Sequence, residues 1–140
     1  MTRRFEEVAA GEELPTLSKI VTREDVKAYA DASGDQNPLH QDDAVARALG
    51  FPGIIAHGMF TMAHMASCVT RWLGDAQAVS RLRAHFRAPV LMGETIVAGG
   101  TVRSVDARTR SAVLDLWVRL ERDGRTEHPI RRGEAEVRLD

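Results

Sequence analysis

The feature that most limits the fold of this chain is the run from Ile54 to Thr70, which contains no Asp, Glu, Lys or Arg. If residues 58–73 form a helix, their apolar side chains cover much of the helical wheel, so the helix must be surrounded by other elements. The run also carries two histidines, a glycine and a serine, and it is short for a bilayer crossing of ~20 residues. We therefore predict a buried helix and no membrane span.

The segment after this helix alternates apolar and polar residues with a period of two, which indicates a strand. Leu82, Ala84, Phe86 and Ala88 share one face, and the opposite face carries Arg81, Arg83, His85 and Arg87. Further strands are predicted over 95–105, 111–122 and 130–139, separated by turn-like residues. Short links between successive strands imply an antiparallel sheet. We therefore expect an α+β architecture in which the sheet curls around the helix.

Composition narrows the classes of partner. The chain has 140 residues, the usual size of one domain, and its 19 Lys and Arg against 20 Asp and Glu give a net charge of −1. It lacks the positive field that nucleic-acid binding requires, so we expect no nucleic-acid partner. Cys68 is the single cysteine, and acidic residues stand where a secretory signal would be apolar. These features predict a protein of the reducing cytoplasm.

A first helix is expected to begin near Arg23, because Thr22-Arg-Glu-Asp25 has the spacing of a capping box. Ser33-Gly34 ends its apolar pattern, since glycine tolerates a positive φ. A loop follows over 33–40, in which Pro38 restricts the backbone. A short helix is then predicted over 44–49, before the turn-rich segment 50–53.

That first loop concentrates the chemistry-bearing side chains Asp35, Asn37 and His40 within six positions. A carboxylate and an imidazole in one cavity can position a water molecule and move its protons, as general acid–base catalysis requires. The alternative is that Asp35 and Asn37 form Asx turns and that His40 is a surface residue. The spacing alone leaves both interpretations open.

A second motif, Ala-His57-Gly58-Met59, stands directly before the buried helix, whose first N–H groups lack intrahelical acceptors. Because Gly58 has no Cβ, a substrate carbonyl can approach its N–H closely, and the helix dipole favours negative charge there. Alternatively, Gly58 serves only the tight packing of a buried helix start.

Together these motifs resemble the MaoC-like (R)-specific enoyl-thioester hydratases, the hydratase 2 family. Ser33-Gly-Asp-Gln-Asn-Pro-Leu-His40 contains its Gly-Asp-x-Asn-Pro-x-His pattern, followed by Asp42 and the later His-Gly-Met. Val-Thr-Arg-Trp at 69–72 extends the similarity to the B-type subunits of mycobacterial (3R)-hydroxyacyl-ACP dehydratases. The resemblance covers nearly the whole chain, and it implies one hot-dog domain over 1–140, with an antiparallel sheet wrapped around a long central helix.

The resemblance also implies hydration of trans-2-enoyl thioesters and dehydration of (3R)-hydroxyacyl thioesters in fatty acid metabolism. Asp35 and His40 are then the catalytic dyad, Gly58 contributes to the oxyanion hole, and Asn37 shapes the loop and its water. Coenzyme A or an acyl-carrier protein carries the substrate, and no metal or redox cofactor is expected. Which member of the dyad takes the proton from water is left open.

The substrate-binding set is expected to comprise Asn37, His57, Arg81, Arg83 and Arg87. The arginines offer bidentate contacts to the phosphates of a carrier. The alternative is that the arginine ladder is a solvated face of the sheet, since Arg is frequent throughout the chain. Likewise, Met59, Met62 and Met65 either line an acyl tunnel or pack in the core.

One position departs from the family pattern. Some members carry a helix serine that bonds the catalytic histidine, whereas Ala66 stands there and Ser67 lies about 100° around the helix. Another group must then orient His40, or the site is less competent than the motif suggests.

Two other functions are compatible with the sequence. A hot-dog thioesterase would release free thiol from an acyl thioester, and a non-catalytic acyl-binding subunit would bind substrate beside a catalytic partner. We expect a homodimer that hides the sheet edges, with a heterodimer of related hot-dog subunits as the alternative.

Overall fold

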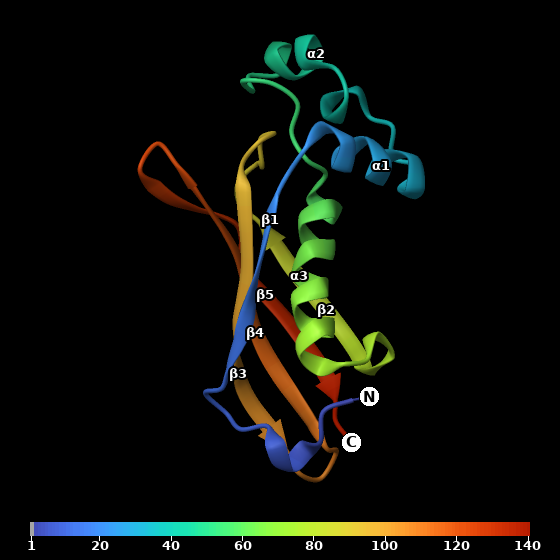
Figure 1. Cartoon of the computed structure of the whole chain (residues 1–140), viewed down its shortest axis with the longest axis vertical. Helices are drawn as coiled ribbons and strands as arrows, with labels where there is room; N and C mark the ends of the chain where they lie inside the picture. Colours follow the sequence, from blue (N-terminus) through green and yellow to red (C-terminus); the bar gives the residue numbers. More distant parts are fainter. Residues whose placement is uncertain (1) are drawn as a thin grey trace.

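The computed structural model describes residues 2–140, which form a five-stranded antiparallel sheet with one long helix on its face. The strands are β1 (Glu13–Ile20), β2 (Val79–Phe86), β3 (Thr95–Asp106), β4 (Ser111–Arg122) and β5 (Arg125–Arg138), in the order β1-β3-β4-β5-β2. The helices are α1 (Arg23–Ser33), α2 (Asp43–Ala48) and α3 (Gly58–Leu73), with short 3-10 turns at Phe5–Glu7, Pro38–His40 and Ala76–Ala78. Figure 1 shows α3 along the curved sheet and α1 and α2 beyond its N-terminal end.

The predicted α+β architecture is confirmed, because α3 contacts every strand of the sheet. Alternation along the central strand β4 shows why the core forms on this face: Ala112, Leu114, Leu116, Val118 and Leu120 are buried. Gly133 on β5 permits the close approach of the helix, because a Cβ there would lie 2.6 Å from the Met65 sulfur.

Burial of α3 is less complete than its composition predicted. Its buried face carries Thr61, His64, Met65, Cys68, Val69, Trp72 and Leu73. Met59, Ala63 and Ser67, spaced four residues apart, are exposed along the opposite side. Of the three methionines, only Met65 is fully buried, and Met62 packs against the core edge. In a single copy of the chain the sheet therefore covers one side of the helix.

Two strands differ from the sequence expectation. β1 was not predicted, because Pro15 interrupts its alternation; it is an edge strand, and its register with β3 shifts between Leu14 and Leu17. β5 begins at Arg125 rather than at residue 130, since the tight turn at Asp123 (φ 53°) and Gly124 (φ 74°) pairs it directly with the end of β4.

Both ends of the described chain are attached near the C-terminal end of α3 (Figure 1). The Arg3 N–H donates to the Leu73 carbonyl, and the Phe5 N–H donates to the Asp140 carbonyl. The Trp72 indole N–H donates to the Glu12 carboxylate at 2.6 Å. The Arg3 guanidinium lies over the indole ring, 4.8 Å from its centroid. Across residues 2–140, none of the helices combines the length and the apolar character that a membrane crossing needs.

Candidate active site

The loop after α1 is shaped by short-range hydrogen bonds of its own side chains. α1 starts at the predicted capping box of Thr22 and Asp25 and ends at Gly34, whose φ is 80°. The Asp35 carboxylate then accepts from the Asn37 N–H at 3.2 Å, and the Asn37 side-chain oxygen accepts from the Leu39 N–H at 3.0 Å. Both residues therefore form Asx turns, which stiffen the loop rather than exclude a chemical role.

The tertiary structure brings Asp35 and His40 together with His57, which lies in the segment before α3. One ligand-type atom of each side chain lies within 4.8 Å of the other two. Asp35 is exposed, His40 is half-buried, and His57 is only 2% exposed. The three groups thus run from the surface into the protein at the N-terminal end of α3.

His40 is oriented by the backbone of residue 55 rather than by a helix serine. Its Nδ1 lies 2.7 Å from the Ile55 carbonyl oxygen, which can only accept, so Nδ1 carries the proton. The neutral ring then presents Nε2 as a hydrogen-bond acceptor. Ser67 instead donates to the Ala63 carbonyl on the exposed side of α3. The Ile55 carbonyl therefore bonds His40 in this chain, where some family members use a serine at the position of Ala66.

His57 supports both members of the pair. Its Nε2 donates to the Asp35 carbonyl oxygen at 3.0 Å, and its ring stacks on that of His40 with centroids 3.9 Å apart and planes 26° apart. The Tyr29 ring of α1 also packs against His57, with the two ring centroids 5.0 Å apart. The buried Nδ1 of His57 has no hydrogen-bond partner within residues 2–140. His57 therefore holds the loop backbone and the His40 ring by separate contacts.

The same three residues, one carboxylate and two imidazoles, have the composition of a metal site. One nitrogen of each imidazole is already bonded to a backbone carbonyl. The two rings are stacked with their planes 26° apart, so the in-plane lone pairs of the remaining nitrogens lie in stacked planes. This arrangement fits ring stacking better than coordination of an ion.

Gly58 begins α3 immediately after the buried His57, but Gly58 itself is exposed, which differs from the expected buried helix start. A Cβ built on Gly58 would lie 3.3 Å from the ring of Phe86, which is 50% exposed at the end of β2. A cavity of about 300 Å³ adjoins Gly58, and its lining is mainly apolar: Phe51, Ile55, Ala56, Thr61, Phe86, Ala88, Pro89, Val90 and Pro129, with Arg87.

The three arginines of the expected substrate-binding set are not gathered at one place. Arg87 follows β2 and lines the cavity beside Gly58. Arg81 and Arg83 alternate with Leu82 and Ala84, which pack against the core, so they lie on the sheet face away from α3. Arg83 there approaches Glu134 at 3.8 Å and lines a separate hollow of about 470 Å³ that contains none of the loop residues.

Sequence reasoning missed two contributors to the site. The Ile55 carbonyl carries no side-chain signal, since any residue offers the same acceptor. The contact of the Phe86 ring beside Gly58 joins residues far apart in sequence, and the sequence placed Phe86 only on the apolar face of a strand. Motif analysis finds side chains, whereas these two roles depend on where the backbone passes.

Comparison with known proteins decides the family. The sequence model of the MaoC-like domain matches residues 6–119, which include the loop, α3, the strands β1, β2 and β3, and most of β4. The chain belongs to the MaoC-like domain family. Its hot-dog architecture, one antiparallel sheet around a central helix, is that of other MaoC-like structures.

Three relatives illustrate the relationship of this MaoC-like chain. It is 36% identical over 91 residues to a mitochondrial 3-hydroxyacyl-acyl-carrier-protein dehydratase of Arabidopsis thaliana, covering 65% of this chain and 53% of the relative. It is 31% identical over 99 residues to an (R)-specific enoyl-CoA hydratase of Rhodospirillum rubrum, covering 70% and 68%. The solved (R)-hydratase from A. caviae involved in PHA biosynthesis superposes with a TM-score of 0.86 at 26% identity, over 96% of this chain and 99% of that one.

The lengths of these relatives differ. This MaoC-like chain spans about half of the Arabidopsis protein, and 28% of a 3-hydroxyacyl-thioester dehydratase X of Mycobacterium tuberculosis to which it is 37% identical. It spans nearly all of the A. caviae hydratase.

Proposed function

We propose that this chain, as one MaoC-like hydratase domain over residues 1–140, catalyses (R)-specific hydration of trans-2-enoyl thioesters and the reverse dehydration of (3R)-hydroxyacyl thioesters. The observation that carries the proposal is the juxtaposition of Asp35 and His40 beside the N-terminus of α3. The hydratase and dehydratase names of its relatives support the same reaction class.

The proposed chemistry assigns one task to each group. During hydration, a water oxygen bonds to C3 while the π electrons of the C2–C3 bond move toward the thioester oxygen. The His40 Nε2, unprotonated while Nδ1 bonds Ile55, accepts a proton from the water with Asp35 beside it. The pair returns one proton to C2, so the dyad ends in its starting protonation state.

Charge develops on the thioester oxygen in this reaction, and we assign its stabilisation to the Gly58 N–H and the dipole of α3. The apolar cavity beside Gly58 offers space for the acyl portion of the substrate. Arg87 at that cavity is positioned to meet a phosphate of coenzyme A or phosphopantetheine, and Asn37 and His57 act by holding the loop. We leave Arg81 and Arg83 out of this site, because they lie on the other face of the sheet.

We also propose that the chain forms a homodimer or pairs with a related hot-dog subunit. β1 and β2 are the edges of the sheet, Phe86 at the end of β2 lies beside Gly58 of α3, and the next residue, Met59, is exposed. Pairing there would cover unpaired backbone groups and exposed apolar surface together.

The testing experiment follows the loss of enoyl absorbance with crotonyl-CoA and a longer enoyl-CoA, with chiral analysis of the product. Asp35→Asn and His40→Ala are expected to lower kcat by at least about a hundredfold, since general acid–base groups typically contribute that much. Asp123→Asn and His85→Ala, which change exposed residues away from the loop, are matched controls expected to retain activity.

The alternatives give different results in the same assay. Release of free thiol without an (R)-3-hydroxy product would identify a thioesterase. Binding of enoyl thioester without turnover, on both CoA and carrier-protein substrates, would identify an acyl-binding subunit that needs a catalytic partner.

A further inference from the structure

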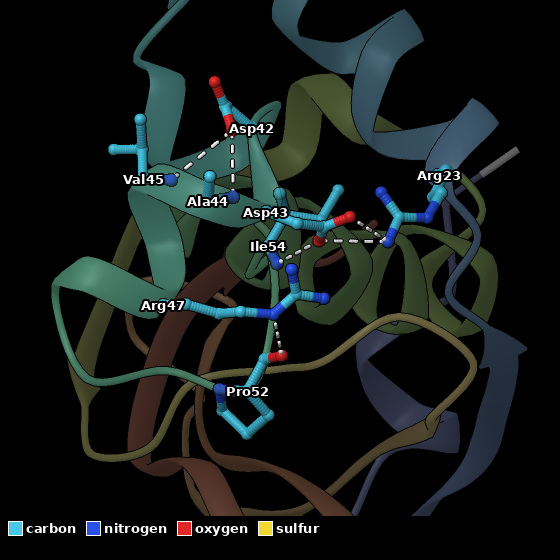
Figure 2. A network of polar contacts seen from close by, with 8 residues as sticks. All are labelled: Arg23, Asp42, Asp43, Ala44, Val45, Arg47, Pro52 and Ile54. Carbon is cyan, nitrogen blue, oxygen red and sulfur yellow. Dashed lines mark hydrogen bonds and ion pairs between the residues drawn. The ribbon is translucent and has the colours of Figure 1, made fainter.

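Asp43, the first residue of α2, connects three segments around the candidate active site (Figure 2). One oxygen of its carboxylate accepts from the Ile54 N–H at 2.9 Å, and the guanidinium of Arg23 at the start of α1 approaches both oxygens, at 2.8 and 3.0 Å. Ile54 belongs to the segment of residues 49–57, here called the strap, which joins α2 to α3.

The strap carries the acceptor that orients His40. One residue after Ile54, the Ile55 N–H donates to the Leu39 carbonyl at 3.4 Å, and the Ile55 carbonyl accepts from His40 Nδ1 at 2.7 Å. On its other side the strap is held by the Ala56 N–H, which donates to the Val90 carbonyl at 2.9 Å. The Ile55 carbonyl thus lies between two anchored residues: Ile54, whose N–H bonds Asp43, and Ala56, whose N–H bonds Val90.

We propose that Asp43 is a positioning residue of the active site: by holding the Ile54 N–H, it keeps the Ile55 carbonyl where it accepts the Nδ1 proton of His40. The inference rests on the function proposed above and adds a residue outside the Asp35–His40 pair. Loss of the Asp43 anchor lets the strap shift on that side, so the Nε2 of His40 is less often directed at the substrate.

Two further observations fit this role. Gly53 leaves room for the carboxylate, because a Cβ there would lie 3.0 Å from the Asp43 oxygen that accepts from Ile54. The Ile54 N–H and the Arg23 guanidinium hold the pKa of Asp43 below its usual value, against a smaller opposing effect of desolvation. The carboxylate is therefore ionised at neutral pH, which strengthens its bond to the strap.

The neighbouring Asp42 provides a matched control. It also lies at the start of α2, where its side chain accepts from the Ala44 and Val45 N–H groups, but within residues 2–140 none of its hydrogen bonds reaches the strap (Figure 2). Asp42→Ala therefore weakens the helix start without removing the anchor on Ile54.

The experiment compares wild type, Asp43→Ala, Asp43→Asn and Asp42→Ala by kcat and KM with crotonyl-CoA, and by the ¹⁵N signals of the His40 ring. We expect Asp43→Ala to lower kcat about tenfold with KM within about threefold, because misplacement of a catalytic group acts on the chemical step. Its ring should also lose part of the Nδ1-protonated form. Asp42→Ala should keep both properties near wild type.

A change in stability alone would affect Asp43→Ala and Asp42→Ala alike and leave the ring signals unmoved, and that result overturns the proposal. If Asp43→Ala does not fold, Gly53→Ala displaces the carboxylate from the other side, and Asp43→Asn removes its charge. An unchanged kcat and unchanged ring signals in Gly53→Ala also overturn it, whereas Asp43→Asn, whose amide oxygen can still accept from the Ile54 N–H, should lie closer to wild type than Gly53→Ala. If wild type is inactive, the proposed function fails, while the ring signals still decide whether Asp43 orients His40.

Discussion

His64 is a buried histidine on α3 that takes no part in the candidate active site. Its Nε2 donates to the Leu17 carbonyl of β1 at 2.8 Å, and the side chain is 8% exposed. Desolvation lowers the pKa of His64 below its ordinary value of 6.5, helped by the positive charges of Lys19 and Arg71, while the bond to Leu17 opposes the change. The folded protein therefore binds a proton at this site less readily than the unfolded chain does.

This difference predicts a loss of stability in mild acid. As the pH falls below about 6.5, the unfolded chain gains a proton at residue 64 before the folded chain does, so the free energy of unfolding decreases. His64→Gln, whose amide can still donate to Leu17, should show a shallower decrease between about pH 7 and pH 5 in urea unfolding. His85→Gln, at an exposed position, should keep the wild-type slope, and an equal slope in all three proteins would contradict the prediction.

Gly58 gives a second prediction at the residue scale. Gly58→Ala places a methyl group 3.3 Å from the Phe86 ring, at the N–H assigned to the oxyanion hole, while alanine suits a helical backbone. We expect kcat/KM to fall at least about tenfold with little change in thermal midpoint, because a displaced oxyanion donor affects the transition state. Adding Phe86→Leu, which relieves the contact, should restore part of the activity. Full activity in Gly58→Ala alone would exclude close approach of substrate to this N–H.

At the scale of elements, α1 leads into the loop of Asp35, and its first turn is held by hydrogen bonds between two residues only three positions apart. The Asp25 N–H donates to the Thr22 hydroxyl, and the Thr22 N–H donates to the Asp25 carboxylate, as the four-residue motif predicted. Thr22→Ala should lower the free energy of unfolding by ~1 kcal/mol, because the Asp25 N–H loses its acceptor. Thr22→Ser keeps the hydroxyl and should lie close to wild type in the same urea titration.

Elements were predicted well where their signals lie within a few neighbouring residues. The caps of α1 and α2, the glycine end of α3 and the turn at Asp123 each combine side-chain and backbone requirements within about four positions. β1 escaped prediction, because an edge strand interrupted by Pro15 buries few side chains on a regular alternation. Its existence depends on pairing with β3, some eighty residues later in the chain.

For the whole molecule, the exposed side of α3 and the edge strand β2 lead to a prediction about assembly. Ultracentrifugation should give a mass twice the 15.4 kDa of one chain. Ala63→Glu adds a charge at an exposed position of α3 and should shift the protein toward monomers, because a charge buried at an interface without a partner is costly. Ala107→Glu, in the exposed turn after β3, is the matched control. A monomeric wild type would show that neither surface pairs with a second copy.

By itself the sequence determined the long helix, four of the five strands and the grouping of Asp35, Asn37 and His40 in one stiff loop. These features follow from periodicity and from hydrogen bonds between near neighbours, which act over a few residues. The tertiary structure alone decided that the Ile55 carbonyl orients His40, that Asp43 holds the strap, and that the Phe86 ring lies beside Gly58. It also separated Arg87 from Arg81 and Arg83: β2 ends at Phe86, so Arg87 no longer follows the alternation that places Arg81 and Arg83 on one face of the sheet. Such contacts depend on where distant segments meet, which local sequence patterns do not specify.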